Sequence, residues 1–508
     1  MSKPGRGDGG LELFSSRWAL LLTTLGMAVG TGNIWRFPRI ISKCGGGAFL
    51  IPWLLFLFAW SIPLLVLELG MGRTSRRGCV GAFAHFAGPK MGFLGTFVAF
   101  CCTAIMFYYA VVAGWCLKYL LAGARGDLRG VAGDAAERVF LDFANSPEPV
   151  IYQVLAMGVA GVVVLGGVVR GIERANKVLI PALFVLLLLA LVRSLSLPGA
   201  GAGLSFLFTV DWALLGDANT WIEALCQSAW STGAGWGLML TYGVYVSRKE
   251  QVVSNAVITG LGNNAASVIA AMAIIPAVFA LAPMAVSPER LAELGGVEGF
   301  LTAGGPASTG LTFIWIPALF EKMPLGGLFT ALFFLTLFFA ALSSLIAMVE
   351  LASRVLIDMG VKRKAAVMVV VGTAIVLGIP SAVNLEIFQN QDWAWGLGLM
   401  VSGLFVALAV VRYGPARFRR DALSEREAGL LGRFFDRWIL FAIPAQFLIM
   451  LGWWFSQSVS WDPDGWWNPM GTFTVGTCLA QWAVALGAFV ALNRWLVKRS
   501  KGAEGGGA

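Results

Sequence analysis

The sequence predicts an all-α membrane protein with twelve transmembrane helices, arranged as two inverted five-helix repeats followed by helices 11 and 12. Hydrophobic residues make up 58% of the 508 residues and charged residues 13%, against about 25% charged residues in a soluble chain. A soluble core of this length would not be so apolar, so lipid is the expected solvent. Two apolar segments are also interrupted by glycine-rich sequences, which is typical of transporters built from inverted repeats.

Each predicted helix is an apolar stretch of roughly 20 residues, the length that crosses a bilayer core. The stretches lie at 18–42, 47–71, 91–122, 150–169, 176–195, 218–246, 252–282, 325–358, 364–382, 392–413, 435–456 and 470–497. If the interrupted helices 1 and 6 correspond, residues 17–195 form the first repeat and residues 218–413 the second. Helices 11 and 12, within 435–497, then lie outside the repeat, where packing or dimerisation is their expected role.

Basic residues recur in every second loop, which places those loops and both termini in the cytoplasm. The predicted cytoplasmic segments are the N-terminal tail 1–16, the linker 414–434 and the C-terminal tail 498–508, and residues 196–217 form an extracellular connection. The expected location is the plasma (inner) membrane, crossed many times. The net charge of +9 does not indicate nucleic acid, because the basic residues lie at the ends of apolar spans.

A long extracellular segment, 284–318, separates predicted helices 7 and 8. It contains proline and glycine clusters and two short amphipathic stretches. A lid over a vestibule would have this composition, and so would an inert connector.

The first interruption lies at Gly30–Gly32 in predicted helix 1. Backbone groups left unpaired inside a membrane are tolerated only where they face protein or a water-filled cavity. The half-helix that begins near Asn33 points its N–H groups at the gap and suits a carboxylate. The half-helix that ends near Val29 presents carbonyls, which suit a hard cation such as sodium. A glycine pair can also be only a packing notch between helices.

The second interruption, residues 231–235 in predicted helix 6, supports the functional interpretation. Ser231 supplies a hydroxyl and a carbonyl, while Gly233 and Gly235 free the backbone. Trp230 and Trp236 flank the interruption and offer aromatic walls to a small pocket.

Neutral oxygen donors also interrupt two other apolar runs, at Ser343-Ser344 and at Asn263-Asn264. A serine pair can bond back to its own helix, but a buried amide needs partners. Oxygen donors without a histidine or cysteine cluster fit a monovalent cation better than zinc.

Four motifs resemble the neurotransmitter:sodium symporter family, in particular its bacterial amino-acid transporters. They are Gly26–Pro38 (GMAVGTGNIWRFP), Gly45–Phe49 (GGGAF), Arg170–Glu173 (RGIE) and Phe338–Ser344 (FFAALSS). The resemblance runs from about Arg17 to Val411. It implies a sodium-coupled secondary active symporter, not an enzyme, that imports a neutral amino acid by alternating access. The alternative is an amino-acid sensor or channel of the same fold without coupled transport.

The resemblance also implies the ligands of this chain. The substrate-binding residues would be Ala28, Gly30, Thr31, Gly32, Ile105, Tyr109, Trp230, Ser231, Gly233, Trp236, Ser344 and Met348. One sodium ion would be bound by Ala28, Asn33, Ser231 and Asn263, and a second by Gly26, Val29, Ala340, Ser343 and Ser344. The substrate carboxylate would complete the first sodium site, so each ligand would raise the affinity for the other.

Substrate class follows from Gly30, where relatives that carry decarboxylated amines have an aspartate. Without a protein carboxylate there, the substrate has to bring its own, held by the Gly30–Gly32 N–H groups and the Tyr109 hydroxyl. Trp230 and Trp236 narrow the pocket and favour a small or aliphatic amino acid. Gly233 and Thr31 return some space, so bulkier apolar or aromatic substrates stay open.

Gating residues are implied in the same way. Arg36 and Asp392 would form the outer pair, although Asp392 could instead cap predicted helix 10. Tyr245 and Asp358 match the inner gate. The usual N-terminal arginine and tryptophan fall at Leu11 and Phe14, so Arg6 or Arg17 is the expected substitute for the arginine.

Two further expectations concern charge inside the membrane. Glu68, an acid in mid-span, would brace the second interruption, since such residues are costly and usually functional. Gln227, Ser231, Asn263 and Ser267 match a chloride site, with Trp53 at the position of its tyrosine. Chloride, or a proton on a nearby acid, would then balance the charge of sodium.

The expected partners are a small amino acid, sodium and the lipid bilayer, with the protein a monomer or homodimer.

Overall fold

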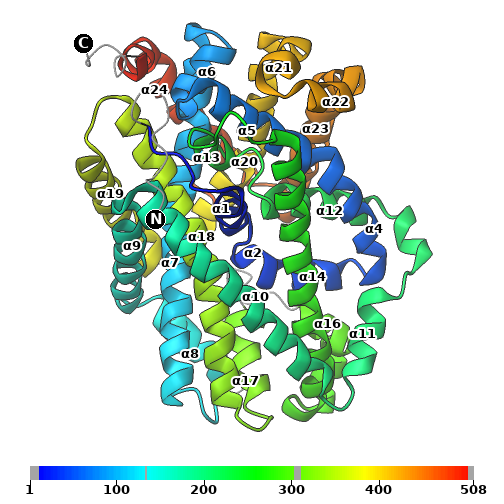
Figure 1. Ribbon diagram of the computed structural model, residues 1–508. Coiled ribbons are helices and arrows are strands. Elements are labelled where there is room, and N and C mark those ends of the chain that lie inside the picture. The colour runs from blue at the N-terminus through cyan, green and yellow to red at the C-terminus, as the bar shows by residue number, and fades with distance from the viewer. Residues whose placement is uncertain (1–10, 132–133, 303–309, 502–508) are drawn as a thin grey trace.

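The computed structural model describes residues 11–131, 134–302 and 310–501, and all regular elements in these residues are helical (Figure 1). Ten helical segments of this part are long and apolar enough to cross a membrane. They comprise α4 (Gly47–Phe56), η1 (Leu57–Ser61) and α5 (Ile62–Ser75) in one span; η2 (Pro89–Met91) with α7 (Gly92–Arg125); α9 (Glu148–Leu165); η3 (Val168–Glu173) with α10 (Arg174–Leu195); α14 (Val252–Ala285); α18 (Gly326–Asp358); α19 (Arg363–Val383); α20 (Leu385–Tyr413); α22 (Glu425–Arg437), η7 (Trp438–Ala442) and α23 (Ile443–Trp461); and α24 (Val475–Lys501).

Two predicted spans are instead series of short helices. The first contains α1 (Arg17–Ala28), α2 (Thr31–Ile34) and α3 (Arg36–Lys43), and the second α12 (Ala218–Ser231) and α13 (Leu238–Gly243). Between α12 and α13, Gly233, Gly235 and Gly237 have φ of 69°, 87° and 79°, a conformation that side chains with a Cβ resist. The glycines therefore make this connection possible.

These short helices lie within the bundle rather than at its surface. Helix α1 packs against α10, α14 and α18, and α13 packs against α5 and α18. In Figure 1, α1 and α2 lie near the centre of the molecule, between the long helices. Any ligand held at their ends is thus enclosed by several spans.

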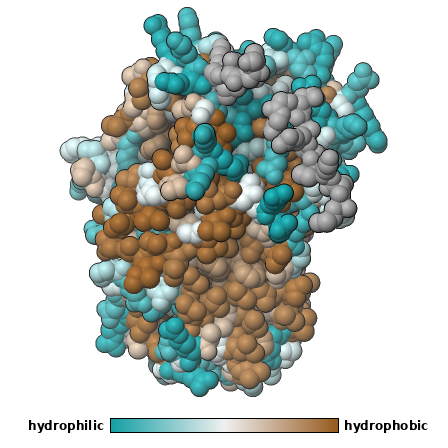
Figure 2. Space-filling view, turned by 60° about the vertical axis from the view of Figure 1, so that its left-hand side comes forward, coloured by the Kyte–Doolittle hydropathy of each residue, from teal (hydrophilic) through white to brown (hydrophobic). Residues whose placement is uncertain are grey.

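Apolar side chains cover the middle of the outer surface. Figure 2 shows a broad hydrophobic band on one face, with hydrophilic residues gathered mostly at the upper end. Several of the long helices carry exposed valines: Val162 on α9, Val192 on α10 and Val376 on α19 are each more than half exposed. A band of this kind matches a lipid-facing surface.

Shorter helices fill the connections between the spans. They are α6 (Cys79–Phe86), α8 (Asp134–Ala144), α11 (Ala200–Phe208), η4 (Trp212–Gly216), α15 (Pro288–Glu293), α16 (Gly296–Thr302), η6 (Gly310–Trp315), α17 (Ile316–Phe320) and α21 (Pro415–Ala422). Within 284–318, α16 packs on α3, and the ring of Phe313 lies 5.6 Å from that of Trp35. This segment therefore covers α3, while residues 303–309 lie outside the described part.

Helix α20 begins earlier than the predicted 392. It starts at Leu385, and the Asn384 side chain accepts a hydrogen bond from Ile387 N at 3.0 Å. Asn384 is therefore the cap of this helix, and Asp392 lies two turns inside it, which excludes the capping interpretation of Asp392.

Candidate functional site

A cavity of about 790 Å³ opens at the ends of α2 and α12. All the predicted substrate-binding residues line it, from Ala28 on α1 to Met348 on α18. Ile105, Met348 and Trp236 are buried apolar walls. The cavity extends past Arg36 and Asp392 to aromatic residues of α23, including Trp454 and Trp461. One continuous space thus joins the predicted pocket to a vestibule.

The first interruption forms one end of the pocket. Helix α2 begins at Thr31 with Gly30 as its N-cap, two residues before the predicted start at Asn33. Gly30 N donates to Asn33 Oδ1 at 2.9 Å, and Thr31 N donates to the Tyr109 hydroxyl at 3.2 Å. The Tyr109 oxygen also accepts from the Thr31 hydroxyl at 3.3 Å. Because this oxygen already accepts two bonds, its own proton is available to an acceptor in the cavity.

Gly30 is closely surrounded. A Cβ at this position would lie 3.1 Å from Ser344 Oγ and 3.1 Å from Tyr109 Oη. By contrast, a Cβ at Gly32 would meet nothing within 4 Å. The pocket therefore has room beside Gly32 and little beside Gly30.

The predicted ligands of the first sodium site lie together. Asn33 Nδ2 is 2.8 Å from Asn263 Oδ1 and 3.1 Å from Ser231 Oγ. One terminal atom of the Asn263 amide lies 3.0 Å from both Ala28 O and Ser231 O. If that atom is oxygen, three oxygens converge there, which is the donor chemistry of a hard cation. If it is nitrogen, it donates to both carbonyls.

The predicted ligands of the second sodium site join α1 to α18. Ser344 Oγ donates to Met27 O at 3.4 Å, and Ser343 Oγ donates to Ala340 O at 3.0 Å. Ser343, Ser344, Ala340 and Val29 are buried. These contacts place hydroxyl and carbonyl oxygens at the C-terminal end of α1, where the carbonyls lack intrahelical partners.

Glu68 on α5 supports the second interruption. Its fully buried carboxylate accepts hydrogen bonds from Gly235 N at 2.6 Å, Gly237 N at 3.2 Å and Leu240 N at 3.2 Å. One acid thus pairs three backbone N–H groups that the broken helix leaves without acceptors.

A family model described as the sodium:neurotransmitter symporter family matches residues 11–130 and 143–498. The chain belongs to this family. It is 30% identical over 444 residues to an uncharacterized sodium-dependent transporter of Methanocaldococcus jannaschii, covering 83% of this chain and 87% of the relative. It is 27% identical over 482 residues to the sodium-dependent neutral amino acid transporter B(0)AT1 of Rattus norvegicus, covering 79% and 75%.

A solved structure gives the same assignment. The crystal structure of MhsT in complex with L-phenylalanine matches with a TM-score of 0.73 and 32% identity, covering 87% of this chain and 99% of that chain. The protein is therefore a multi-pass, sodium-dependent membrane transporter of the sodium:neurotransmitter symporter family, a family of transporters rather than enzymes.

The outer residues of this sodium:neurotransmitter symporter face the cavity without closing it. Arg36 and Asp392 both line the cavity, and no ion pair within 4 Å joins them in the described structure. The Arg36 guanidinium carbon instead lies 4.5 Å from the ring centroid of Trp230. Sequence reasoning missed Arg39 and Lys43, which also line the cavity; Lys43 pairs with Glu223 at 2.7 Å.

At the inner gate, Asp358 has a partner that was not expected from the sequence. Asp358 forms an ion pair with Arg354 at 2.5 Å and accepts from Gly78 N at 2.6 Å. Arg17 instead bonds Ser254 at 2.8 Å, and Arg6 lies outside the described residues. Among the described residues, the cation paired with Asp358 thus comes from the preceding turn of α18, and the (i, i+4) spacing was the signal in the sequence.

Tyr245 belongs to a second buried network, which the sequence analysis missed. Its hydroxyl bonds the fully buried Glu350, which also pairs with Arg363. The ring of Phe14 lies 6.3 Å from that of Tyr245, and Phe14 N donates to Tyr245 O at 3.1 Å. Phe14, at the position where the resemblance implies a tryptophan, thus packs against Tyr245.

Two carboxylates hold the segment that contains Phe14. Glu12 accepts from Val168 N at 2.8 Å and Val169 N at 3.0 Å, at the start of η3. Glu173 accepts from Ser15 N at 2.9 Å and pairs with Lys177 at 2.6 Å. The N-terminal segment is therefore attached to η3 on both sides of Phe14.

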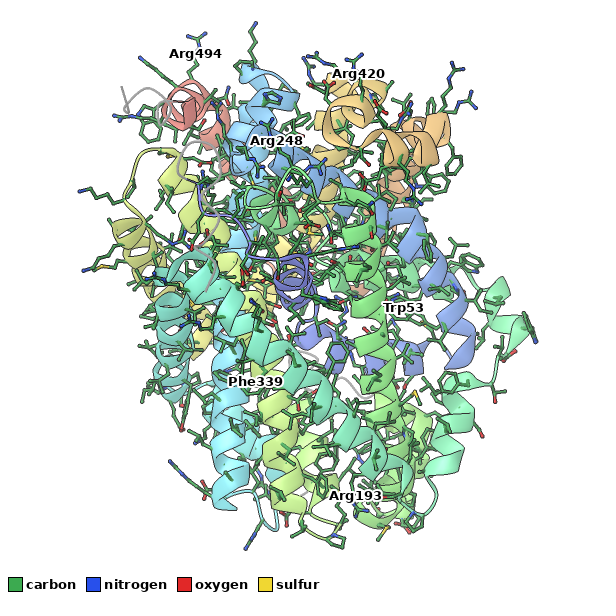
Figure 3. The ribbon with its side chains drawn as sticks, viewed as in Figure 1. Trp53, Arg193, Arg248, Phe339, Arg420 and Arg494 are labelled. Atoms are coloured by element: carbon green, nitrogen blue, oxygen red, sulfur yellow. The ribbon has the colours of Figure 1, made fainter. Side chains whose placement is uncertain are left out.

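The predicted chloride residues lie beside the first sodium set. Ser267 Oγ accepts from Asn33 Nδ2 at 2.7 Å. Gln227 is buried, and neither its amide nitrogen nor its amide oxygen has a hydrogen-bond partner in the described structure. The buried indole N–H of Trp53, labelled in Figure 3, also has no such partner. Trp53, at the position where the resemblance implies a tyrosine, therefore has an N–H group free to donate.

Proposed function

We propose that this protein imports a neutral amino acid, small or aliphatic, together with sodium, by alternating access. The substrate class is inferred from the side chains around Gly30. Among the described residues that line the cavity, the carboxylates belong to Glu223, Asp392 and Asp462. Glu223 pairs with Lys43, at the far end of α3 from Gly30. The pocket end therefore has N–H and hydroxyl donors without a protein acid, which suits a substrate that carries its own carboxylate.

The available donors support the pose. Tyr109 Oη can donate to a carboxylate, and so can Gly32 N in the first turn of α2. The neighbouring Thr31 N and Asn33 N already donate to Tyr109 Oη and Gly30 O. The amino group would meet carbonyls of Ala28, Trp230 and Ser231. Gly233 is open, with its nearest neighbour, Met27 Cε, 3.7 Å from a Cβ built there. This space would also admit a larger apolar side chain, and the MhsT structure contains L-phenylalanine. Larger apolar amino acids are therefore included in the competition panel described below.

Two sodium ions are proposed at the two oxygen sets. Ala28, Asn33, Ser231 and Asn263 would hold the first, and Gly26, Val29, Ala340, Ser343 and Ser344 the second. The support for a cation at the first set is the Ala28 carbonyl, the Ser231 hydroxyl and the Asn263 amide, which are neutral oxygen donors. The Asn33 nitrogen faces these groups and its oxygen accepts from Gly30 N, so the Asn33 amide would turn when the ion binds. Sodium would supply the positive charge that a substrate carboxylate needs, and its gradient would drive uptake.

Chloride is proposed as the counter-ion at Gln227, Ser231, Asn263 and Ser267, with Trp53 as an added donor. The support is the pair of buried groups, Gln227 and Trp53, that lack partners. A buried donor without a partner is costly, and an anion would satisfy it. Proton compensation on a nearby acid is the competing arrangement.

The arrangement in the membrane is part of the same proposal. The ten long spans and the two interrupted segments together make twelve, with α1–α3 and α12–α13 as the broken members of two inverted repeats. Basic residues then place both termini and the α21–α22 connection in the cytoplasm. The Arg36–Asp392 pair would close the outer side, and the Arg354–Asp358 region the inner side.

A competition panel tests the substrate class. The purified protein is reconstituted in liposomes, and each of the twenty amino acids and their decarboxylated amines competes with a labelled neutral amino acid for sodium-driven uptake. We expect competition by neutral amino acids and none by the corresponding amines. Competition by amines at equal strength would contradict the carboxylate assignment. Sodium-dependent binding without accumulation would favour a sensor or channel.

A further inference from the structure

Helices α21 and α22 form a hairpin at one end of the molecule, at the top in Figure 1. Residues 412–437, which contain the hairpin, hold seven arginines, no lysine and four acids. Arginine is suited to phosphate groups because its planar guanidinium can bind two oxygens at once. The composition therefore favours a phosphate-bearing partner, and the position of each arginine decides which side can bind it.

Some of these arginines are already paired. Arg419 pairs with Asp436 at 2.7 Å, and Arg417 and Arg420 pair with Asp421 at 3.4 and 3.1 Å. Figure 3 shows Arg420 at the upper edge of the hairpin. These pairs hold the two helices of the hairpin together or neutralise its α21 side.

Three arginines of α22 remain exposed and make no ion pair with the described residues: Arg426, Arg433 and Arg437. Leu430 is 77% exposed and Phe434 70% exposed on the same helix. Arg426 and Leu430 lie one turn apart before Gly432, whose backbone is non-helical (φ 57°) and kinks α22. Arg433 and Arg437 lie one turn apart after this kink, with Phe434 between them. Arginine side chains without an ion pair thus lie close in sequence to large apolar side chains that no other part of the described protein covers.

The apolar side of α22 continues into the span that follows. Phe441 in η7 and Leu448 in α23 are also about two-thirds exposed (67% and 66%), and residues 425–461 form one continuous candidate span. Trp438, at the junction, donates its indole N–H to Ala59 O at 2.7 Å. Tryptophan is enriched where a span meets the headgroup layer. The exposed arginines therefore lie at the depth of lipid phosphates.

The hairpin is firmly attached to the transporter. Glu427 accepts from Val253 N at 2.7 Å, at the first turn of α14, and from Ser424 at 2.8 Å. Arg73 of α5 donates to Ala422 O at 2.7 Å and also bonds Glu250 O. A ligand bound to α22 would therefore lie next to the hydrogen bonds that attach the hairpin to the ends of α5 and α14.

We infer that the exposed arginines of α22, Arg426, Arg433 and Arg437, bind the phosphate headgroups of anionic lipids, with Leu430 and Phe434 inserted beside the acyl chains. Basic side chains together with exposed leucine and phenylalanine are the composition of helices that lie in the membrane interface. The site needs no substrate and does not depend on the proposed transport activity.

Native mass spectrometry tests the site directly. The protein is taken from nanodiscs of equal phosphatidylglycerol and phosphatidylcholine, and the retained lipids are counted. We expect wild type to retain phosphatidylglycerol preferentially, and R426Q/R433Q/R437Q to lose most of that preference, about fivefold in partitioning for each arginine. The control R125Q/R129Q/K322Q removes three exposed cations near the opposite end of the long helices and should keep the preference.

Three results would overturn the site. The α22 triple variant could retain as much phosphatidylglycerol as wild type. The control could lose the preference equally, which would indicate a general charge effect. Excess inorganic phosphate could displace the retained lipid, which would indicate a soluble-anion site. A charge-preserving variant, R426K/R433K/R437K, should retain more phosphatidylglycerol than the glutamine variant, and equal loss in both would also contradict the inference.

Discussion

Arg354 and Asp358 form an ion pair of 2.5 Å within one helix, at the end of α18 that Tyr245 covers. Both side chains are nearly buried, at 11% and 5% exposure, and the Asp358 carboxylate also holds Gly78 N. Removing one partner of a buried pair costs about 3–5 kcal/mol, because the other charge stays buried. The pair therefore fastens α18 to the start of α6.

Arg354→Gln should loosen this inner layer. Cys79, the first residue of α6, is fully buried and lies against Gly237, so it reports the opening. We expect its labelling by N-ethylmaleimide to rise severalfold, as read by peptide mass spectrometry. Arg17→Gln, which loses only the exposed bond to Ser254, is the control and should leave Cys79 protected. Unchanged labelling in Arg354→Gln would remove Arg354 from the inner gate.

Glu68→Gln should destabilise the second interruption. Glutamine keeps the shape but offers one acceptor oxygen, where Glu68 accepts from three backbone N–H groups. A buried donor without its acceptor costs about 1–3 kcal/mol. We expect a lower thermal unfolding temperature in detergent together with weaker substrate binding. A variant as stable as wild type would show that the glycine-rich connection holds without this acid.

Gly30→Asp should abolish amino-acid uptake, because it places an anion where the substrate carboxylate would bind. The paired variant Gly30→Ala separates charge from size. Its Cβ would lie 3.1 Å from Ser344 Oγ and Tyr109 Oη, so we expect weakened uptake rather than none. Initial uptake rates in proteoliposomes measure both. Survival of uptake in Gly30→Asp would show that the assigned site is wrong.

Ser343→Ala should raise the sodium concentration needed for half-maximal uptake, because it removes one oxygen donor from the second sodium set. The hydroxyl bonds only Ala340 O within the same helix, so the effect on folding should be small. Ser402→Ala is a matched control, since that buried hydroxyl also bonds a carbonyl of its own helix, Gly398 O at 3.1 Å. An equal sodium dependence in both variants would argue against the second site.

Replacing chloride by gluconate should slow uptake if chloride balances the sodium charge. Gln227→Ala should then reduce the chloride dependence, because it removes one of the buried groups without a partner. Uptake that is identical in gluconate would favour compensation by a proton.

The span pattern was readable from the sequence because apolar runs and glycine interruptions are local signals. Glu68 and Gly30 were readable for the same reason, since an acid or a glycine pair is unusual inside an apolar run. The partners were not: Glu350 meets Tyr245 and Arg363 across three elements, and sequence order does not reveal such contacts. The hydrogen bonds of Gly30 N and Thr31 N depend on where α2 begins, which shifted by two residues.

Accumulation of an amino acid against its own concentration gradient is the most direct test of sodium-coupled transport. Proteoliposomes that contain potassium are diluted into sodium medium with a labelled neutral amino acid, and the internal concentration is followed. We expect the internal concentration to rise transiently above the external concentration, and we expect this overshoot to be lost when potassium replaces sodium outside. Equilibration without overshoot, or the same accumulation in potassium, would contradict sodium-coupled transport.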